Sequence, residues 1–169
     1  MTRRVAILGL GARGARWAEA FHSSGWVVSG FDPEPSAGRA LTDLTDMRRE
    51  TTISATVRNA NWVMCCLPER LELTQMVLQR AQAEAPETSV IAVASRQSDL
   101  EDIQSCSIRP SQIVRVTEAS DGSLSLDVSE RNQTEFRDEA RIVLAELAAV
   151  LSLSPPKVVG EQKSDAKSA

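Results

Sequence analysis

The run Val5-Ala6-Ile7-Leu8-Gly9-Leu10-Gly11-Ala12-Arg13-Gly14 decides how this chain folds. Its four apolar residues predict a buried strand, and the glycines after them predict a tight turn. Ala18 and Phe21 then follow Gly14 at helical spacing, and Gly25 is suited to end that helix. The next apolar run, 26–31, predicts a second strand. The opening of the chain is therefore strand, turn, helix and strand.

The rest of the chain continues to alternate strand and helix patterns. Continuous apolar runs at 62–67 and 89–94 predict strands that are buried on both faces, as in a parallel sheet covered by helices. Weaker strand patterns occur at 112–117 and 123–128, around an Asp121-Gly122 turn. We expect an α/β fold with a doubly wound, mainly parallel sheet. It forms one domain over residues 1–159, followed by a disordered polar tail over 160–169.

Two further helices are predicted between and after these strands. One follows Pro68, with Leu73, Met76, Val77 and Ala81 on its inward face. The other begins near Asn132, where Glu135 three residues later suits a capping box.

Composition excludes several classes of function. The chain has 169 residues, of which 42% are hydrophobic and 25% charged, as expected for a single domain with a core. The net charge of -4, without a basic cluster, argues against nucleic-acid binding. No apolar run approaches the roughly 20 residues of a membrane helix, and no signal peptide is evident, so we expect a soluble, cytoplasmic protein. The three cysteines indicate neither a disulfide framework nor a metal site.

The glycines between the first strand and helix match G-x-G-x-x-G, the fingerprint of the Rossmann dinucleotide-binding fold. Gly9 permits the tight turn, Gly11 lets a pyrophosphate approach the backbone, and Gly14 lets the helix pack on the strand. The pyrophosphate would lie on unpaired amides at the helix N-terminus. Arg13 is either a further phosphate contact or a surface arginine.

An acid follows at the end of the second strand, where adenosine ribose hydroxyls are bound. Asp32 occupies that position. Asp32 and Glu34 would repel the 2′-phosphate of NADP, so NAD is the predicted cofactor. The alternative is a plain strand-to-helix connection with Asp32 as a solvated turn residue.

Three stretches resemble the NAD-binding domain of the 3-hydroxyacyl-CoA dehydrogenases. They are 5–35, Leu67-Pro68-Glu69-Arg70-Leu71-Glu72-Leu73 and Ala94-Ser95-Arg96-Gln97-Ser98-Asp99-Leu100. The resemblance covers most of residues 4–159 and implies an NAD-dependent oxidoreductase of fatty acid metabolism acting on an acyl-CoA. It places Glu69 near the nicotinamide ribose and Ser98 at the substrate oxygen. Glu69 also fits a helix N-terminal carboxylate, and Ser98 an N-cap. The predicted cofactor-binding residues are Gly9, Gly11, Ala12, Arg13, Gly14, Asp32 and Glu69.

The chain departs from this family at the catalytic segment, which reads G-L-H-F-F-N-P in the enzymes. The corresponding stretch, 115–121, puts Thr117 at the position of the histidine base. Threonine cannot take a proton near neutral pH, so no catalytic residue is assigned. The glutamate that holds the base would fall near Leu126 or Asp127. His22 lies on the first helix, and Glu118 would face away from Thr117.

Family enzymes also continue into a helical domain that completes the substrate cleft. We therefore expect an NAD(H)-binding module that is inactive alone and that forms a homo-oligomer or joins a partner subunit. The alternative is an active dehydrogenase of 3-hydroxyacyl-CoA or a related 3-hydroxy acid, completed by a partner chain. A third interpretation, a 3-hydroxyisobutyrate or 6-phosphogluconate dehydrogenase, fits the Gly9-Leu10-Gly11 opening but not the segment 70–73.

Overall fold

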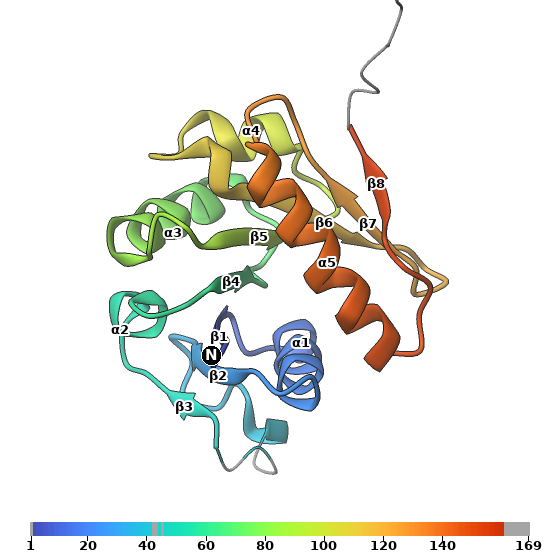
Figure 1. Cartoon of the computed structure of the whole chain (residues 1–169). Coiled ribbons are helices and arrows are strands. Elements are labelled where there is room, and N and C mark those ends of the chain that lie inside the picture. The colour runs from blue at the N-terminus through green and yellow to red at the C-terminus, as the bar shows by residue number, and fades with distance from the viewer. Residues whose placement is uncertain (1, 42–43, 45, 161–169) are drawn as a thin grey trace, which may run out of the picture.

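A computed structural model describes residues 2–41, 44 and 46–160, and shows a sheet flanked by helices on both faces (Figure 1). Within these residues the sheet has eight strands in the order β3-β2-β1-β4-β5-β6-β7-β8. The strands are β1 Arg4–Leu8, β2 Val27–Phe31, β3 Arg48–Arg49, β4 Trp62–Cys65, β5 Val90–Ala94, β6 Ile113–Glu118, β7 Leu124–Asp127 and β8 Lys157–Val159. The helices are α1 Ala12–Ser23, α2 Ile53–Val57, α3 Leu71–Glu84, α4 Leu100–Ser105 and α5 Thr134–Val150, with short 3-10 turns at Arg39–Leu41 and Pro110–Gln112.

The two faces of the sheet carry separate halves of the core. Val5 and Ile7 of β1 pack with α1 and α5, whereas Ala6 and Leu8 pack with α2, α3 and α4. The adjacent Cys65 and Cys66 likewise belong to opposite halves. Successive strand residues point to opposite faces, so an apolar run without alternation fills both layers. The predicted doubly wound, mainly parallel α/β fold is confirmed.

The sheet reverses its strand order at β1. From β1 the chain first adds β2 and β3 on one side, and then returns to place β4, β5 and β6 on the other. All of these strands are parallel, so their carboxyl ends meet along one edge. Ligands of open α/β sheets bind in the crevice outside that edge, at the reversal of strand order.

The C-terminal part leaves this parallel pattern. β7 runs antiparallel to β6 after a turn in which Gly122 has a φ of 83°, as the Asp121-Gly122 pair predicted. β8, which the sequence did not indicate, pairs parallel with β7. Of the predicted tail, 161–169 lie outside the described residues. Gly160 lies so close to Val128 that a Cβ on it would be 2.2 Å from the Val128 carbonyl oxygen.

The predicted capping box at the start of α5 is wrong. Gln133, not Asn132, is the N-cap residue, and its side chain makes no capping hydrogen bond. Asn132 is buried instead, and its side-chain amide donates to the carbonyl oxygens of Ile113, at 2.7 Å, and Ser111, at 3.2 Å. A buried amide group needs hydrogen-bond partners. These two hydrogen bonds connect the segment before α5 to the start of β6.

Candidate dinucleotide site

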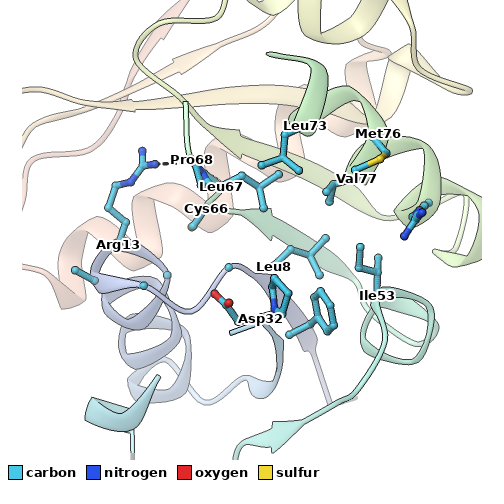
Figure 2. Close-up of a pocket in the computed structure, with 17 residues that line it drawn as sticks. Leu8, Arg13, Asp32, Ile53, Cys66, Leu67, Pro68, Leu73, Met76 and Val77 are labelled. Atoms are coloured by element: carbon cyan, nitrogen blue, oxygen red, sulfur yellow. Dashed lines mark hydrogen bonds between the residues drawn. The ribbon is translucent and has the colours of Figure 1, made fainter. Parts of the chain in front are cut away.

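A cavity of about 610 Å³ opens at the carboxyl ends of β1, β2 and β4 (Figure 2). It lies where the strand order reverses, and α1, α2 and α3 contribute to its walls. The cavity brings together six of the seven residues predicted to bind the cofactor: Gly9, Gly11, Ala12, Arg13, Gly14 and Asp32.

The three glycines of the loop have different physical roles. Gly9 has a φ of 96°, and a Cβ on it would lie 2.3 Å from the Cys66 carbonyl oxygen. A Cβ on Gly14 would lie 1.8 Å from the Gly9 carbonyl oxygen, so α1 can cross the loop this closely only without a side chain. A Cβ on Gly11, by contrast, would meet no atom within 4 Å and would face open space. Gly9 and Gly14 shape the turn, whereas Gly11 keeps the approach to the backbone clear.

The N-terminus of α1 points its free amides at this cavity. The first helical hydrogen bond runs from Ala15 N–H to the Gly11 carbonyl oxygen, at 2.8 Å, so the amides of the preceding residues have no partner within the helix. The first turn carries no acidic side chain that would neutralise them. Such a helix end binds anions, because the free N–H groups and the helix dipole both favour negative charge.

Asp32 joins the end of β2 to the glycine loop. One of its carboxylate oxygens accepts from Leu10 N–H and the other from Glu34 N–H, each at 2.8 Å. Every carboxylate oxygen has two acceptor sites, so both retain one for a further donor such as a ribose hydroxyl. The side chain is half-buried and lines the cavity beside the loop.

The remainder of the cavity wall is largely apolar. Leu73, Met76 and Val77 of α3 face Ile53 of α2 across it, as Figure 2 shows. Met76 was predicted on the inward face of its helix, yet its side chain is 46% exposed because that face borders the cavity. Ile53 was not predicted, since α2 is too short to leave a periodic pattern. An apolar slot beside an acid and free amides suits a flat ring joined to a polar ribose phosphate.

Glu69 lies beyond the cavity lining and bridges the ends of β4 and β5. Its carboxylate accepts from the Ser95 hydroxyl at 2.7 Å and from Arg96 N–H at 2.9 Å, and lies 3.6 Å from the Arg13 guanidinium. Burial acts to raise the pKa of Glu69, but these hydrogen bonds and the arginine outweigh it and hold the pKa below its usual value. Glu69 is therefore an anion whose hydrogen bonds connect the ends of β4 and β5.

Ser98 follows this bridge at the start of α4. Its N–H donates to the Ser95 hydroxyl at 3.1 Å, and its carbonyl oxygen accepts from Arg115 at 2.6 Å. Asp99 is the N-cap residue of α4 and makes no side-chain capping bond. The N-cap interpretation of Ser98 is therefore wrong, and its backbone, rather than its hydroxyl, connects the loops.

Thr117 and the charged side chains near it are engaged with partners in the protein. The Thr117 hydroxyl donates to the Ser95 carbonyl oxygen at 3.3 Å. On the same face of β6, Arg115 forms an ion pair with Asp127 of β7, and both side chains are more than four-fifths buried. Glu118 points to the opposite face, as predicted, and pairs with Arg16 of α1.

Two other groups of interest lie apart from Thr117. His22 is half-buried in the last turn of α1, away from the cavity lining. Cys66 lines the cavity, but burial raises the pKa of its thiol to about 12, although Arg13 acts to lower it. A thiol in that state is not a nucleophile near neutral pH.

Comparison with known proteins identifies the class to which this site belongs. The family described as the NAD binding domain of 6-phosphogluconate dehydrogenase matches residues 4–111, which span β1 through α4 and include the whole cavity lining. The chain belongs to this family. This family match confirms the predicted cofactor, NAD. The family name corresponds to the third interpretation of the sequence, and the segment 70–73 does not exclude it.

The curated relatives of this NAD-binding domain are L-carnitine dehydrogenases. The protein from Streptomyces coelicolor is 29% identical over 66% of this chain and 41% of its own length. An L-carnitine dehydrogenase/betainyl-CoA thioesterase from Ruegeria pomeroyi is 29% identical over 65% of this chain and 26% of its length. The chain thus spans well under half of the curated relatives that it matches.

Solved structures share the fold over nearly the whole chain. The (S)-3-hydroxybutyryl-CoA dehydrogenase of Ralstonia eutropha superposes with a TM-score of 0.83 at 15% identity, covering 95% of this chain and 64% of that one. The 3-hydroxybutyryl-CoA dehydrogenase of Escherichia coli K12 gives a TM-score of 0.80 at 16% identity, covering 95% and 38%. The predicted resemblance to the NAD-binding domain of the 3-hydroxyacyl-CoA dehydrogenases is confirmed in its fold.

Proposed function

We propose that this chain binds NAD(H) through the glycine loop and Asp32, and that by itself it does not catalyse the dehydrogenation of a 3-hydroxyacyl-CoA. The observation that carries the first part is the convergence of Gly11, the free amides of α1 and Asp32 on one cavity. NAD supplies a hydride acceptor when bound. The chain's own contribution is to hold the pyrophosphate at the helix end and a ribose at the Asp32 carboxylate.

Specificity for NAD over NADP follows from the charges at the end of β2. Asp32 and Glu34 lie two residues apart, and the Asp32 carboxylate accepts a hydrogen bond from the Glu34 backbone N–H. A 2′-phosphate placed on the ribose would meet this negative charge, and Arg49, which reaches this loop from β3, is already hydrogen-bonded to the carbonyl oxygens of Glu34 and Ala37. We therefore assign NAD rather than NADP to this site.

The second part of the proposal rests on the groups around Thr117. A general base must be within hydrogen-bond reach of the proton it takes, and its pKa must suit the pH. Thr117 fails the second condition, and the nearby Asp127 is engaged by Arg115. The chain's single histidine, His22, lies on another element. These residues leave the hydride transfer without a proton acceptor.

A second candidate function is an active dehydrogenase that a partner chain completes. It is favoured by the relatives, which are dehydrogenases of more than twice the matched length. In that case a partner subunit or a second copy would contribute the base and hold the substrate, an acyl-CoA or another 3-hydroxy acid. We place either form in the cytoplasm. No helix in the described part of the chain is long and apolar enough to cross a bilayer.

Titration with NADH, followed by acetoacetyl-CoA, tests both parts. We expect NADH fluorescence to change on binding and its absorbance to stay constant after the acyl-CoA is added. Oxidation of a different substrate, L-carnitine, with NAD should be equally silent. A turnover number in the usual enzyme range of about 1–10³ per second would contradict the inactive module. Activity that appears only when a co-purified protein is added would establish the second candidate.

A further inference from the structure

Arg13 lies across the carboxyl ends of β4 and β5. Its guanidinium donates to the Leu67 carbonyl oxygen at 2.8 Å and to the Ala94 carbonyl oxygen at 3.4 Å. It also lies 3.6 Å from the Glu69 carboxylate, whose pKa is held low. Figure 2 shows the side chain extending from α1 toward Leu67 and Pro68, away from Asp32. The arginine is 42% exposed and has three partners along this edge.

Two hollows of very different size lie on either side of this side chain. The cavity that contains Asp32 has a volume of about 610 Å³. The hollow beyond Arg13 is bordered by Ala94, Ser95, Arg96 and Glu118, and has about 20 Å³, which is room for about one water molecule. Arg13 lines both. Arg13 therefore separates a cavity that is large enough for a nucleotide from a hollow that is too small for one.

The fold decides which half of a dinucleotide would meet Arg13. A bound pyrophosphate would lie at the N-terminus of α1, and Asp32 at the end of β2 would accept from the adenosine ribose. β2 lies on one side of β1, and β4 and β5 lie on the other. A dinucleotide that crosses the reversal of strand order must therefore place its nicotinamide half over the ends of β4 and β5. That is the edge covered by Arg13.

We propose that this chain recognises dinucleotides through their ADP half, and that Arg13 keeps the nicotinamide half out of contact with the protein. The proposal rests on the proposed binding of NAD(H) and specifies the chemical class of the ligand as adenosine diphosphates, including ADP-ribose. The apolar slot of Ile53, Leu73 and Val77 would receive the adenine. Displacing Arg13 would leave two carbonyl oxygens and the Glu69 anion without this partner, which opposes entry of the second half.

Calorimetric titration with NAD and with ADP-ribose tests this, because the two ligands differ only in the nicotinamide. For the native protein we expect dissociation constants within about threefold of each other, since a group that makes no contact adds no affinity. Arg13→Met keeps the length of the side chain and removes the guanidinium. It should strengthen NAD binding about tenfold and leave ADP-ribose binding unchanged within about threefold. Arg141→Met, an exposed position on α5, is the matched control and should change neither.

Amide chemical shifts of the native protein give a second measurement that needs no variant. NAD should shift the signals of Gly11, Ala12 and Asp32, and should leave those of Ser95 and Arg96 in place. Shifts at Ser95 and Arg96 that NAD produces and ADP-ribose does not would overturn the inference. So would NAD binding that is tenfold tighter than ADP-ribose binding. Failure of both ligands to bind would overturn the proposed function itself, and the inference with it.

Discussion

The two ends of the crevice differ in what their side chains are free to do. On the Asp32 side, backbone amides and carboxylate acceptor sites face an open, largely apolar cavity. Around the ends of β4, β5 and β6, the charged side chains are engaged with each other: Arg115 with Asp127, Arg16 with Glu118, and Arg13 with Glu69. A binding site needs unsatisfied groups that a ligand can complete, whereas paired charges stabilise the empty protein. The comparison indicates that the Asp32 side presents groups that a nucleotide could complete, whereas the charged groups of the other side already have protein partners.

The largest effect is expected from a side chain added at Gly14, the last glycine of the motif, in the first turn of α1. Gly14→Ala would bring a methyl carbon to 1.8 Å from the Gly9 carbonyl oxygen, so α1 and β1 would have to separate. We expect unfolding in urea to show a loss of more than about 3 kcal/mol. An unchanged urea midpoint would mean that Gly14 does not pack against the Gly9 carbonyl oxygen as described.

Gly11→Ala separates binding from stability in the same loop. The backbone there has a φ of -66°, which any residue adopts, and a Cβ would meet no atom within 4 Å. The free energy of unfolding should therefore stay within about 0.5 kcal/mol of the native value. The added methyl group would occupy the path of the pyrophosphate, and NADH affinity should fall by about 10- to 100-fold. Native affinity in the fluorescence titration would show that the phosphates lie elsewhere.

Asp32→Ala tests the acid on the open side. It removes the acceptor for Leu10 N–H and the one offered to the ribose. NAD affinity should weaken by about 1–3 kcal/mol through the lost charge-assisted hydrogen bonds. Competition between NAD and NADP for the native protein provides the companion measurement, with NAD preferred. Equal affinity for the two cofactors would contradict the role given to Asp32 and Glu34.

The smallest effect concerns the Glu69 side of the crevice and depends on pH. The pKa of Glu69 is lower in the folded protein than its usual value of 4.5, so its contacts stabilise the fold above that pH. This contribution is lost as the pH falls through the folded-state pKa. The side chain is 23% exposed, so we expect it to be worth less than about 1 kcal/mol. Native protein and Glu69→Gln should differ in urea stability at pH 7, and the difference should shrink as the pH falls below 4.5. A difference that stays constant with pH would contradict the charged state assigned to Glu69.

Local patterns predicted the parts of the site that are made of backbone. The glycine loop, the strand before it and Asp32 at the end of β2 were all evident from spacing, because each is fixed by neighbours within a few residues. The same reasoning failed at Asn132. Asparagine three residues before a glutamate fits a capping box, but Asn132 is buried against the start of β6, and a buried amide takes the nearest carbonyl partners available.

The sequence by itself determined the parallel sheet, the dinucleotide loop and the acid that follows it, since continuous apolar strands and required glycines follow from local sterics and burial. Only the tertiary structure decided what Arg13 does. From the sequence it was either a phosphate contact or a surface residue, and the structure shows an exposed side chain that hydrogen-bonds along the edge of the sheet. Its partners, Leu67, Ala94 and Glu69, come from two other strand ends far along the chain. A long, flexible cation pairs with whatever acceptors the fold brings within its reach, and that proximity is created by the order of strands in the sheet.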